Sequence, residues 1–523
     1  MADCQCLWWW WWCLQLTSRY AHLSSNNMKM RQQSQSPLFH LPRELRDEIY
    51  EYYTYETDGY HHYPQALNIG EVRQANGESI DVPLKATCKR ISDELKGTAL
   101  RTNTIHFHPN EKRSDFATRS CALRFQRLIE YVNVTKWRMV LLAAECIDGR
   151  ILEEVDRAHP DHHFGAVYNC ARTDQQLPYR PFKFLQRYYN MEQHSISSHR
   201  ALQHCLDLAS AHPRFTERVA AACGDGLPGD FFTPRATFVS GSHVQVLNWN
   251  PSPWYIPSEA ELITMESLLV NQEDIERFAK ENHDDWLDWK FSACAVAIEA
   301  MDRLPPQTFA NLRSIVLHED SVAVSTPESH ALGLVPLKRK NTNLRVERRV
   351  KGYSAYLSRW GYLTSIKLSK ERRDQAMLFF ETLLAWMEQT LDLPAKGLPA
   401  QTFTLLFEKD GDECVWAQLA VAIRMQEAMN EDYRRRNVPR PPITADERFL
   451  SLQFPLPCAL PDWLPDLFRN MAEGTAVHIR YEGSLKEASL DDASDLPSHI
   501  ESAEEWRDVW EKFALAQVQL QLT

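Results

Sequence analysis

The stretch that decides the fold of the first part of this chain covers residues 38–50 and reads LFHLPRELRDEIY. Leu41, Leu45 and Ile49 recur every four residues, which is the spacing of one apolar stripe on a short helix. Pro42 suits the first position of that helix, because the N–H that proline lacks would have no intrahelical partner there. The sequence therefore predicts a short helix with one apolar face at this point.

A second helix and a strand are predicted further along the chain. Apolar residues repeat with helical spacing from Leu84 through Ile91 to Leu95. Residues 103–108 then alternate between apolar and polar side chains, which is the period of a strand with one buried face. A stretch rich in turn residues, 57–81, separates the two predicted helices. We therefore expect a small, mainly helical module that ends near its strand.

These segments resemble a known family. The motif Leu-x-x-Leu-Pro-x-Glu-Leu-x-x-x-Ile at 38–49 looks like the opening of an F-box, and residues 84–91 with 103–107 are similar to the rest of the F-box-like region in uncharacterised filamentous-fungal proteins. The resemblance covers residues 37–110, about a seventh of the chain. It implies an F-box-like adaptor that docks on the Skp-type adaptor of an SCF-type ubiquitin ligase. It further implies that this contact is made by Leu41, Pro42, Leu45, Ile49, Leu84 and Ile91.

An adaptor of this kind acts by bringing two proteins together. The resemblance implies that residues from about 111 to 523 recognise a protein substrate of unknown identity, while other subunits carry out the chemistry. This hypothesis expects no catalytic residue, no metal and no cofactor. The alternative is an interaction scaffold that kept an F-box-like fold without contacting a ligase, in which substitutions in the apolar stripe would only destabilise the fold.

The sequence predicts four parts and an α+β fold overall. They are a disordered tail at 1–36, the helical F-box-like module at 37–110, a helix-rich middle region at 111–305 and an α/β region at 306–523. In the last part, predicted strands alternate with helices, which favours a largely parallel sheet. The predicted strands are residues 312–317, 363–368, 402–407, 449–454 and 476–479.

The charge of the chain argues against nucleic acid as a partner. The 70 acidic and 58 basic residues give a net charge of −12 at neutral pH, and phosphate backbones attract basic surfaces. A basic stretch from Lys338 to Lys351 is the local exception. We interpret that stretch as a solvated helix face, which is the commoner use of such a charge run.

Cysteine spacing and hydropathy indicate the compartment. The 12 cysteines include no C-x-x-C pair, so the ligand spacing of zinc ribbons and thioredoxin-like redox sites is absent. The apolar run at 7–16 is shorter than the twenty or so residues that cross a bilayer, and no positive region of a secretory signal precedes it. We therefore expect a cytoplasmic or nuclear protein with no membrane contact.

One polar cluster supports a third hypothesis, an α/β enzyme. His318, Glu319 and Asp320 follow a predicted strand, and open α/β sheets bind ligands beyond the carboxyl ends of their strands. The histidine could act as a base while the carboxylates orient it or bind a hard cation. A metal site there would need further ligands, and ordinary loop polarity explains the same residues.

Two other patterns have plainer explanations. His106 and His108 share one face of their predicted strand, and His61 and His62 could add ligands, but exposed strand histidines are commoner than metal sites built from them. The sequence GDGLPG at 224–229 spells G-x-G-x-x-G. It follows an alanine-rich helical stretch instead of a strand, so we interpret it as a loop.

Overall fold

The computed structural model describes residues 36–65, 68–80, 83–110, 121–159, 164–174, 196–224, 238–270, 289–351, 372–409, 413–435, 437, 460–476, 478–483 and 485. Within these ranges the chain divides into two compact units. The first is drawn from Met1–His62, Val72–His106 and Pro305–Ile315, and the second from Tyr63–Glu71, Phe107–Leu304 and Val316–Thr523.

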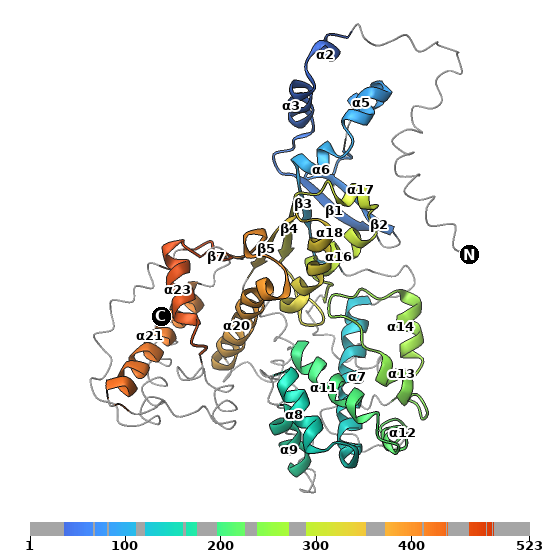
Figure 1. The fold of residues 1–523 in the computed structure, drawn as a ribbon, viewed down its shortest axis with the longest axis vertical. Coiled ribbons are helices and arrows are strands. Elements are labelled where there is room, and N and C mark those ends of the chain that lie inside the picture. The colour runs from blue at the N-terminus through green and yellow to red at the C-terminus, as the bar shows by residue number, and fades with distance from the viewer. Residues whose placement is uncertain are drawn as a thin grey trace. The chain divides into compact units, whose positions relative to one another are not determined.

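The first unit is mainly helical (Figure 1). Its helices are α2 (Pro37–His40), α3 (Arg43–Thr54), α4 (Pro83–Thr87), α5 (Lys89–Glu94), α6 (Thr98–Thr102) and α17 (Pro306–Phe309). The segment at 38–50 is therefore not one helix, because the chain leaves α2 at Leu41 and begins α3 after Pro42. A residue before proline is pushed out of the helical region, and Leu41 is extended, with φ −70° and ψ 144°. Pro42 is accordingly the N-cap of α3 and not its first helical residue.

The turn-rich stretch before α4 forms two strands, which the sequence patterns did not predict. They are β1 (Tyr60–Gln65) and β2 (Asn68–Gln74). The predicted strand near residue 105 is β3 (Thr104–Phe107), and β1 pairs with it in parallel, with Tyr60 opposite Ile105.

The described elements of the second unit from Cys121 to Asp302 are helical, as predicted for the middle of the chain. The helix α7 (Cys121–Leu142) lies at the centre of this group, and α11, α12, α13 and α14 all pack against it (Figure 1). The other members are α8 (Gly149–Ala158), α9 (Phe164–Asp174), α11 (Ile196–Ala209), α12 (Phe215–Ala220), α13 (His243–Asn248), α14 (Glu259–Glu266) and α16 (Ala293–Asp302).

Beyond residue 310, strands alternate with helices. The strands β4 (Ser314–Glu319), β5 (Arg345–Lys351), β6 (Phe403–Glu408) and β7 (Ile479–Tyr481) are neighbours in that order, and β6 pairs in parallel with both β5 and β7. Between them lie the 3-10 helix η4 (Pro327–Leu334) and helices α18 (Val335–Lys340), α20 (Arg372–Lys396), α21 (Glu413–Arg435) and α23 (Leu464–Glu473). The strands predicted at 363–368 and 449–454 lie outside the described residues.

The interpretation of the basic stretch as a solvated helix face was wrong for its second half, and in its first half Lys338 of α18 is buried as well. Residues Arg345–Lys351 form β5, and Val346, Arg348 and Val350 are buried while the residues between them face outward. The alternation of buried and exposed side chains is that of a strand. Strands pair in parallel in both units, and both units contain helices. The fold is therefore α+β with a mostly parallel sheet, as predicted.

Candidate interaction surface

Helix α3 turns its apolar row outward. Leu45 is 45% exposed, Ile49 is 41% exposed and Tyr52 is 87% exposed, and these residues follow one another along one side of the helix. The buried side of the same helix consists of Arg46, Tyr50 and Thr54. The helix therefore buries an arginine and a threonine beside the ring of Tyr50 and leaves a leucine and an isoleucine exposed, whereas an ordinary surface helix buries its aliphatic residues.

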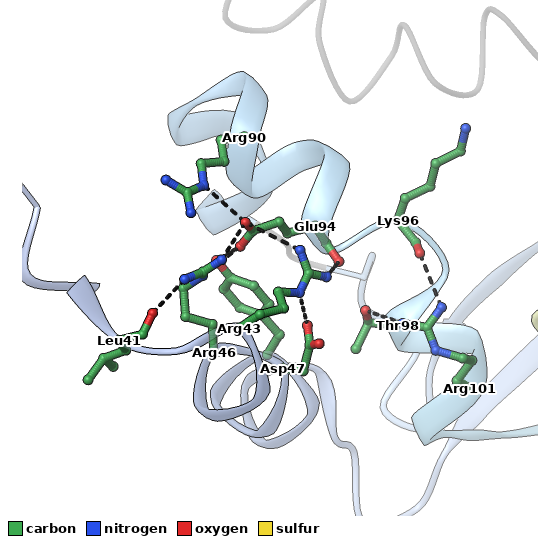
Figure 2. Close-up of polar contacts among 10 residues, drawn as sticks. Leu41, Arg43, Arg46, Asp47, Arg90, Glu94, Lys96, Thr98 and Arg101 are labelled. Carbon is green, nitrogen blue, oxygen red and sulfur yellow. Dashed lines mark hydrogen bonds and ion pairs between the residues drawn. The ribbon is translucent and has the colours of Figure 1, made fainter. Parts of the chain in front are cut away.

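The polar side of α3 is buried because Glu94, the last residue of α5, satisfies it. Arg46 binds the carboxylate with two hydrogen bonds, from Nε to Oε2 and from Nη2 to Oε1, both 2.9 Å long. Tyr50 donates its hydroxyl to Oε2 over 2.9 Å. From outside, Arg90 donates to Oε1 over 3.0 Å and Arg43 lies 3.3 Å from the same oxygen (Figure 2). One buried carboxylate thus holds together the facing sides of two helices.

The electrostatics of this cluster favour an ionised carboxylate. Hydrogen bonds from Arg46 and then from Arg90 and Tyr50 lower the pKa of Glu94 to about 2, against the opposing effect of burial. Burial, followed by the hydrogen bond to this carboxylate, raises the pKa of Tyr50. The cluster therefore stays charged on Glu94 and protonated on Tyr50 across the physiological pH range.

The same cluster fixes the bend before α3. Nη1 of Arg46 donates to the carbonyl oxygen of Leu41 over 2.6 Å, where the chain changes direction between α2 and α3 (Figure 2). This carbonyl has left the regular helix, so the guanidinium supplies the donor that a helix would have supplied. Leu41 itself is half-buried, and Pro42 is exposed.

Beneath α3 lies a small apolar core. Tyr50, Ile91 and Leu95 are buried in it, and Leu84 packs against its edge as a half-buried side chain. Ile91 is only 6% exposed, so the structure places this predicted contact residue in the interior of the unit and not on its surface. Of the six predicted contact residues, Pro42, Leu45 and Ile49 are exposed, and Leu41 and Leu84 are partly so.

Helix α4 extends the apolar row of α3. The backbone N–H of Leu84 donates to Oη of Tyr53 over 3.3 Å, which ties the start of α4 to the last turn of α3. Tyr53 follows Ile49 by four residues and is 38% exposed. Leu45, Ile49, Tyr52, Tyr53 and Leu84 together are called the α3 row below.

Acidic side chains border the α3 row. Glu44, Glu48 and Glu51 are exposed and recur at four and three residues, so they form a second row along the helix beside the apolar one. These glutamates provide positions where a substitution changes the surface without touching the buried cluster at Glu94.

The chain was also compared with known proteins. No protein-family model, curated protein or solved structure matches it. The candidate surface therefore stands on its geometry and on the resemblance of its sequence motif.

The three residues of the enzyme hypothesis do not form one site. Glu319 is buried and accepts hydrogen bonds from Arg348, whose Nε and Nη2 lie 2.9 and 2.7 Å from Oε1. His318 instead stacks on His108 with ring centroids 4.6 Å apart, while Asp320 is exposed. Successive side chains of a strand point to opposite faces, so the glutamate lies on the other face from its two neighbours.

The contacts of Glu319 indicate a role in holding the fold together. Its carboxylate also accepts the backbone N–H groups of Ala293 (3.0 Å) and Cys294 (3.2 Å), the first residues of α16. These donors have no partner within their helix, and a carboxylate also suits the positive end of the helix dipole. On the other side, the guanidinium of Arg348 stacks 4.2 Å above the ring of Trp386. The pair therefore joins β4, β5, α16 and α20.

A serine and a histidine lie close by, and sequence reasoning missed them. Oγ of Ser292 is 2.6 Å from Nδ1 of His330, whose Nε2 is 2.7 Å from the carbonyl oxygen of Ser325. This is the spacing of a nucleophile and its base. However, Ser292 and His330 are fully buried, and the hydroxyl accepts the N–H of Ala295 as the N-cap of α16. The pair therefore caps a helix in the interior.

Two of the four histidines weighed as metal ligands lie side by side. His61 and His106 are register partners on β1 and β3, and their rings stack with centroids 4.7 Å apart. Across the described ranges, no three histidine, cysteine or acidic side chains gather in a group that could hold a metal ion. Of the glycine-rich sequence at 224–229, only Gly224 lies within the described residues. No helix in the part that the structure describes is both long and apolar enough to span a bilayer.

Proposed function

We propose that the first unit docks through the α3 row on the Skp-type adaptor of an SCF-type ubiquitin ligase, so that the chain is an F-box-like adaptor. The observation that carries this proposal is the outward position of Leu45 and Ile49 on a helix whose buried side is polar. An apolar row that a chain leaves in water is a typical interaction site. The F-box-like motif contains both residues, and it supplies the identity of the partner.

The gain from docking can be estimated from exposure. Full burial of a leucine or isoleucine side chain contributes about 1.5–3 kcal/mol, and Leu45 and Ile49 still have 45% and 41% of their surface to bury. Each would then contribute about 1 kcal/mol, with a further contribution from the aromatic rings of Tyr52 and Tyr53. Such a contact can hold a partner in a multi-subunit assembly, where the second unit would meet the substrate and the chain would act by proximity.

Co-elution of purified proteins tests the proposal. The full chain and the Skp-type adaptor of the same species are mixed and separated by size-exclusion chromatography. We expect the wild type to elute with the adaptor and Leu45→Asp/Ile49→Asp to elute alone, because two carboxylates would have to be buried unpaired. Glu48→Ala, on the acidic row of the same helix, is the matched control and should still co-elute.

Two outcomes oppose the proposal. If the wild type does not co-elute with the adaptor, the ligase function fails and the α3 row serves some other partner. If the double variant co-elutes as well as the wild type, the contact is made elsewhere on the chain. Circular dichroism of each variant separates loss of binding from loss of folding, which is the outcome that the scaffold alternative predicts.

A further inference from the structure

We propose that Glu94 is a positioning residue that sets the rotation of α3 about its own axis and thereby keeps the α3 row on the outside. The proposed function enters this inference at one point, the identity of the partner that binds the α3 row. The structural part of the inference, that this buried carboxylate selects which side of α3 is exposed, can be tested without any partner.

Helix α3 has two sides that could face the core. One carries Arg46, Tyr50 and Thr54 at i, i+4 and i+8, and the other carries Leu45 and Ile49. With 3.6 residues per turn, adjacent residues are separated by about 100° around the helix axis, so a roll of about that size exchanges the two sides. The rolled arrangement would bury leucine and isoleucine in place of arginine, which the hydrophobic effect favours, although it would also remove the ring of Tyr50 from the core.

The contacts of the buried side oppose this roll. Arg46 and Tyr50 reach Glu94 with three hydrogen bonds of 2.9 Å, and Arg46 also holds the carbonyl of Leu41 at 2.6 Å. The side chain of Arg46 points from α3 toward Glu94 (Figure 2), and Tyr50 follows it one turn later on the same side of the helix. A roll would break all of these hydrogen bonds and would leave the carboxylate of Glu94, whose side chain is 8% exposed, without its α3 partners.

The end of α3 is held in a different way. Nδ2 of Asn103 donates to the backbone carbonyl of Thr54 over 2.6 Å, and Oη of Tyr60 donates to the same carbonyl over 3.1 Å. A backbone carbonyl at a helix end lies near the helix axis and constrains position more than rotation. Among the side-chain contacts of α3, those with Glu94 are the most numerous, while Tyr53 makes one bond to the start of α4 and Tyr50 also packs in the apolar core. We therefore infer that the contacts with Glu94 are the main determinant of the rotation of α3.

Buried ion pairs suit this role. Taking charges out of water costs about as much as their attraction returns, so an apolar replacement of similar volume is often neutral or stabilising. The best-attested use of such groups is to specify one arrangement among several of similar stability. An arrangement that leaves leucine and isoleucine in water needs such a specifying group, and Glu94 occupies the position to supply it.

The test replaces the buried polar cluster by apolar residues of similar size, in the variant Arg46→Met/Tyr50→Phe/Glu94→Leu. Hydroxyl-radical footprinting read by mass spectrometry then reports the exposure of Leu45 and Ile49 in the full chain. We expect their labelling to fall several-fold, from 45% and 41% exposure towards the 6% of Ile91, while the chain still unfolds cooperatively. The matched control is Arg90→Met, which removes an arginine that contacts Glu94 from α5 and cannot set the rotation of α3.

Each other outcome overturns the inference. Unchanged labelling in a folded triple variant would show that α3 keeps its rotation without the cluster. Loss of cooperative unfolding in that variant would show that the cluster supplies stability and not orientation. A fall in labelling in Arg90→Met as large as in the triple variant would show that the carboxylate acts on α5 instead.

The adaptor provides a separate readout. The triple variant should lose co-elution with the adaptor even though Leu45 and Ile49 are intact, which a purely stabilising role would not cause. If footprinting shows the roll but the wild type never binds the adaptor, the proposed function fails and the positioning role stands. If the wild type and the triple variant bind equally well, the positioning role fails and the proposed function stands.

Discussion

Replacing Glu319 by glutamine should destabilise the second unit strongly. The substitution keeps the size of the side chain but removes the charge that faces Arg348, and both side chains are at most 2% exposed. Breaking a buried ion pair costs roughly 3–5 kcal/mol, because the remaining charge is left uncompensated. The second unit has about 400 residues, for which 1 kcal/mol corresponds to about 1 °C, so the melting temperature should fall by roughly 3–6 °C.

Thermal unfolding followed by circular dichroism measures this effect. The matched control is Asp320→Asn, which makes the same chemical change at the next residue, where the side chain is exposed. A surface substitution of this kind usually changes stability by less than about 0.5 kcal/mol. If Glu319→Gln costs less than about 1 kcal/mol, or if both substitutions cost the same, the structural role of Glu319 is refuted.

A double variant isolates the charge. Glu319→Gln/Arg348→Met removes the guanidinium as well, and the glutamine oxygen can still accept the N–H groups of Ala293 and Cys294. Because no uncompensated charge then remains, the double variant should be more stable than Glu319→Gln alone. If it is less stable, packing of Arg348 on Trp386 is the larger contribution.

Three further predictions concern pH and backbone geometry. Burial lowers the pKa of Lys136 to about 8, so the unfolded chain binds more protons than the folded chain between about pH 8 and 10.5. The free energy of unfolding should therefore rise across that range by up to about 3 kcal/mol. Urea titrations of the wild type and of Lys136→Met at several pH values measure this rise, which the variant should lack. The pKa of Glu94 is about 2, so its contribution is complete above about pH 4.5 and is lost as pH falls to 2. With allowance for solvent screening this is about 1–2 kcal/mol, and it should be missing from Glu94→Gln in acid unfolding curves. Gly97→Ala should cost more than about 1 kcal/mol in urea unfolding of the full chain, because φ is +77° at Gly97 and a Cβ there would collide with the side chain of Asn311.

The sequence predicted which residues of α3 share a face, but it could not tell which face is buried. Leu45 and Ile49 are four residues apart, and so are Arg46, Tyr50 and Thr54, so spacing alone defines two faces, and hydropathy alone would bury the face with leucine and isoleucine. The choice depends on Glu94, which lies 48 residues after Arg46 in the chain. Patterns of neighbouring residues carry no information about a contact between residues so far apart in the sequence.

The strand β5 was misread for a related reason. The four charged residues at its less buried positions suggested a solvated helix. The buried positions, Val346, Arg348 and Val350, are two residues apart, which is the period of a strand. The arginine is buried because Glu319 faces it. A charged residue at a buried position interrupts the alternation of apolar and polar residues by which a strand is predicted, and its distant partner gives no local sign that it is buried.

The candidate catalytic residues could have been separated from sequence alone. His318 and Glu319 are the last two residues of β4 and Asp320 follows it, and side chains along a strand alternate between faces. That rule already places Glu319 opposite its neighbours. The Ser292–His330 pair carried no such signal, because its members are 38 residues apart.

The most direct test of the account is a calorimetric titration of the purified Skp-type adaptor into the full chain, with Leu45→Asp/Ile49→Asp and Glu48→Ala titrated in parallel. The account predicts that the wild type and Glu48→Ala bind with the same affinity, and that the double variant binds at least about 30-fold more weakly, as expected when two side chains that each contribute about 1 kcal/mol are replaced by charges. Equal binding by the double variant, or no heat of binding from a folded wild type, would contradict it.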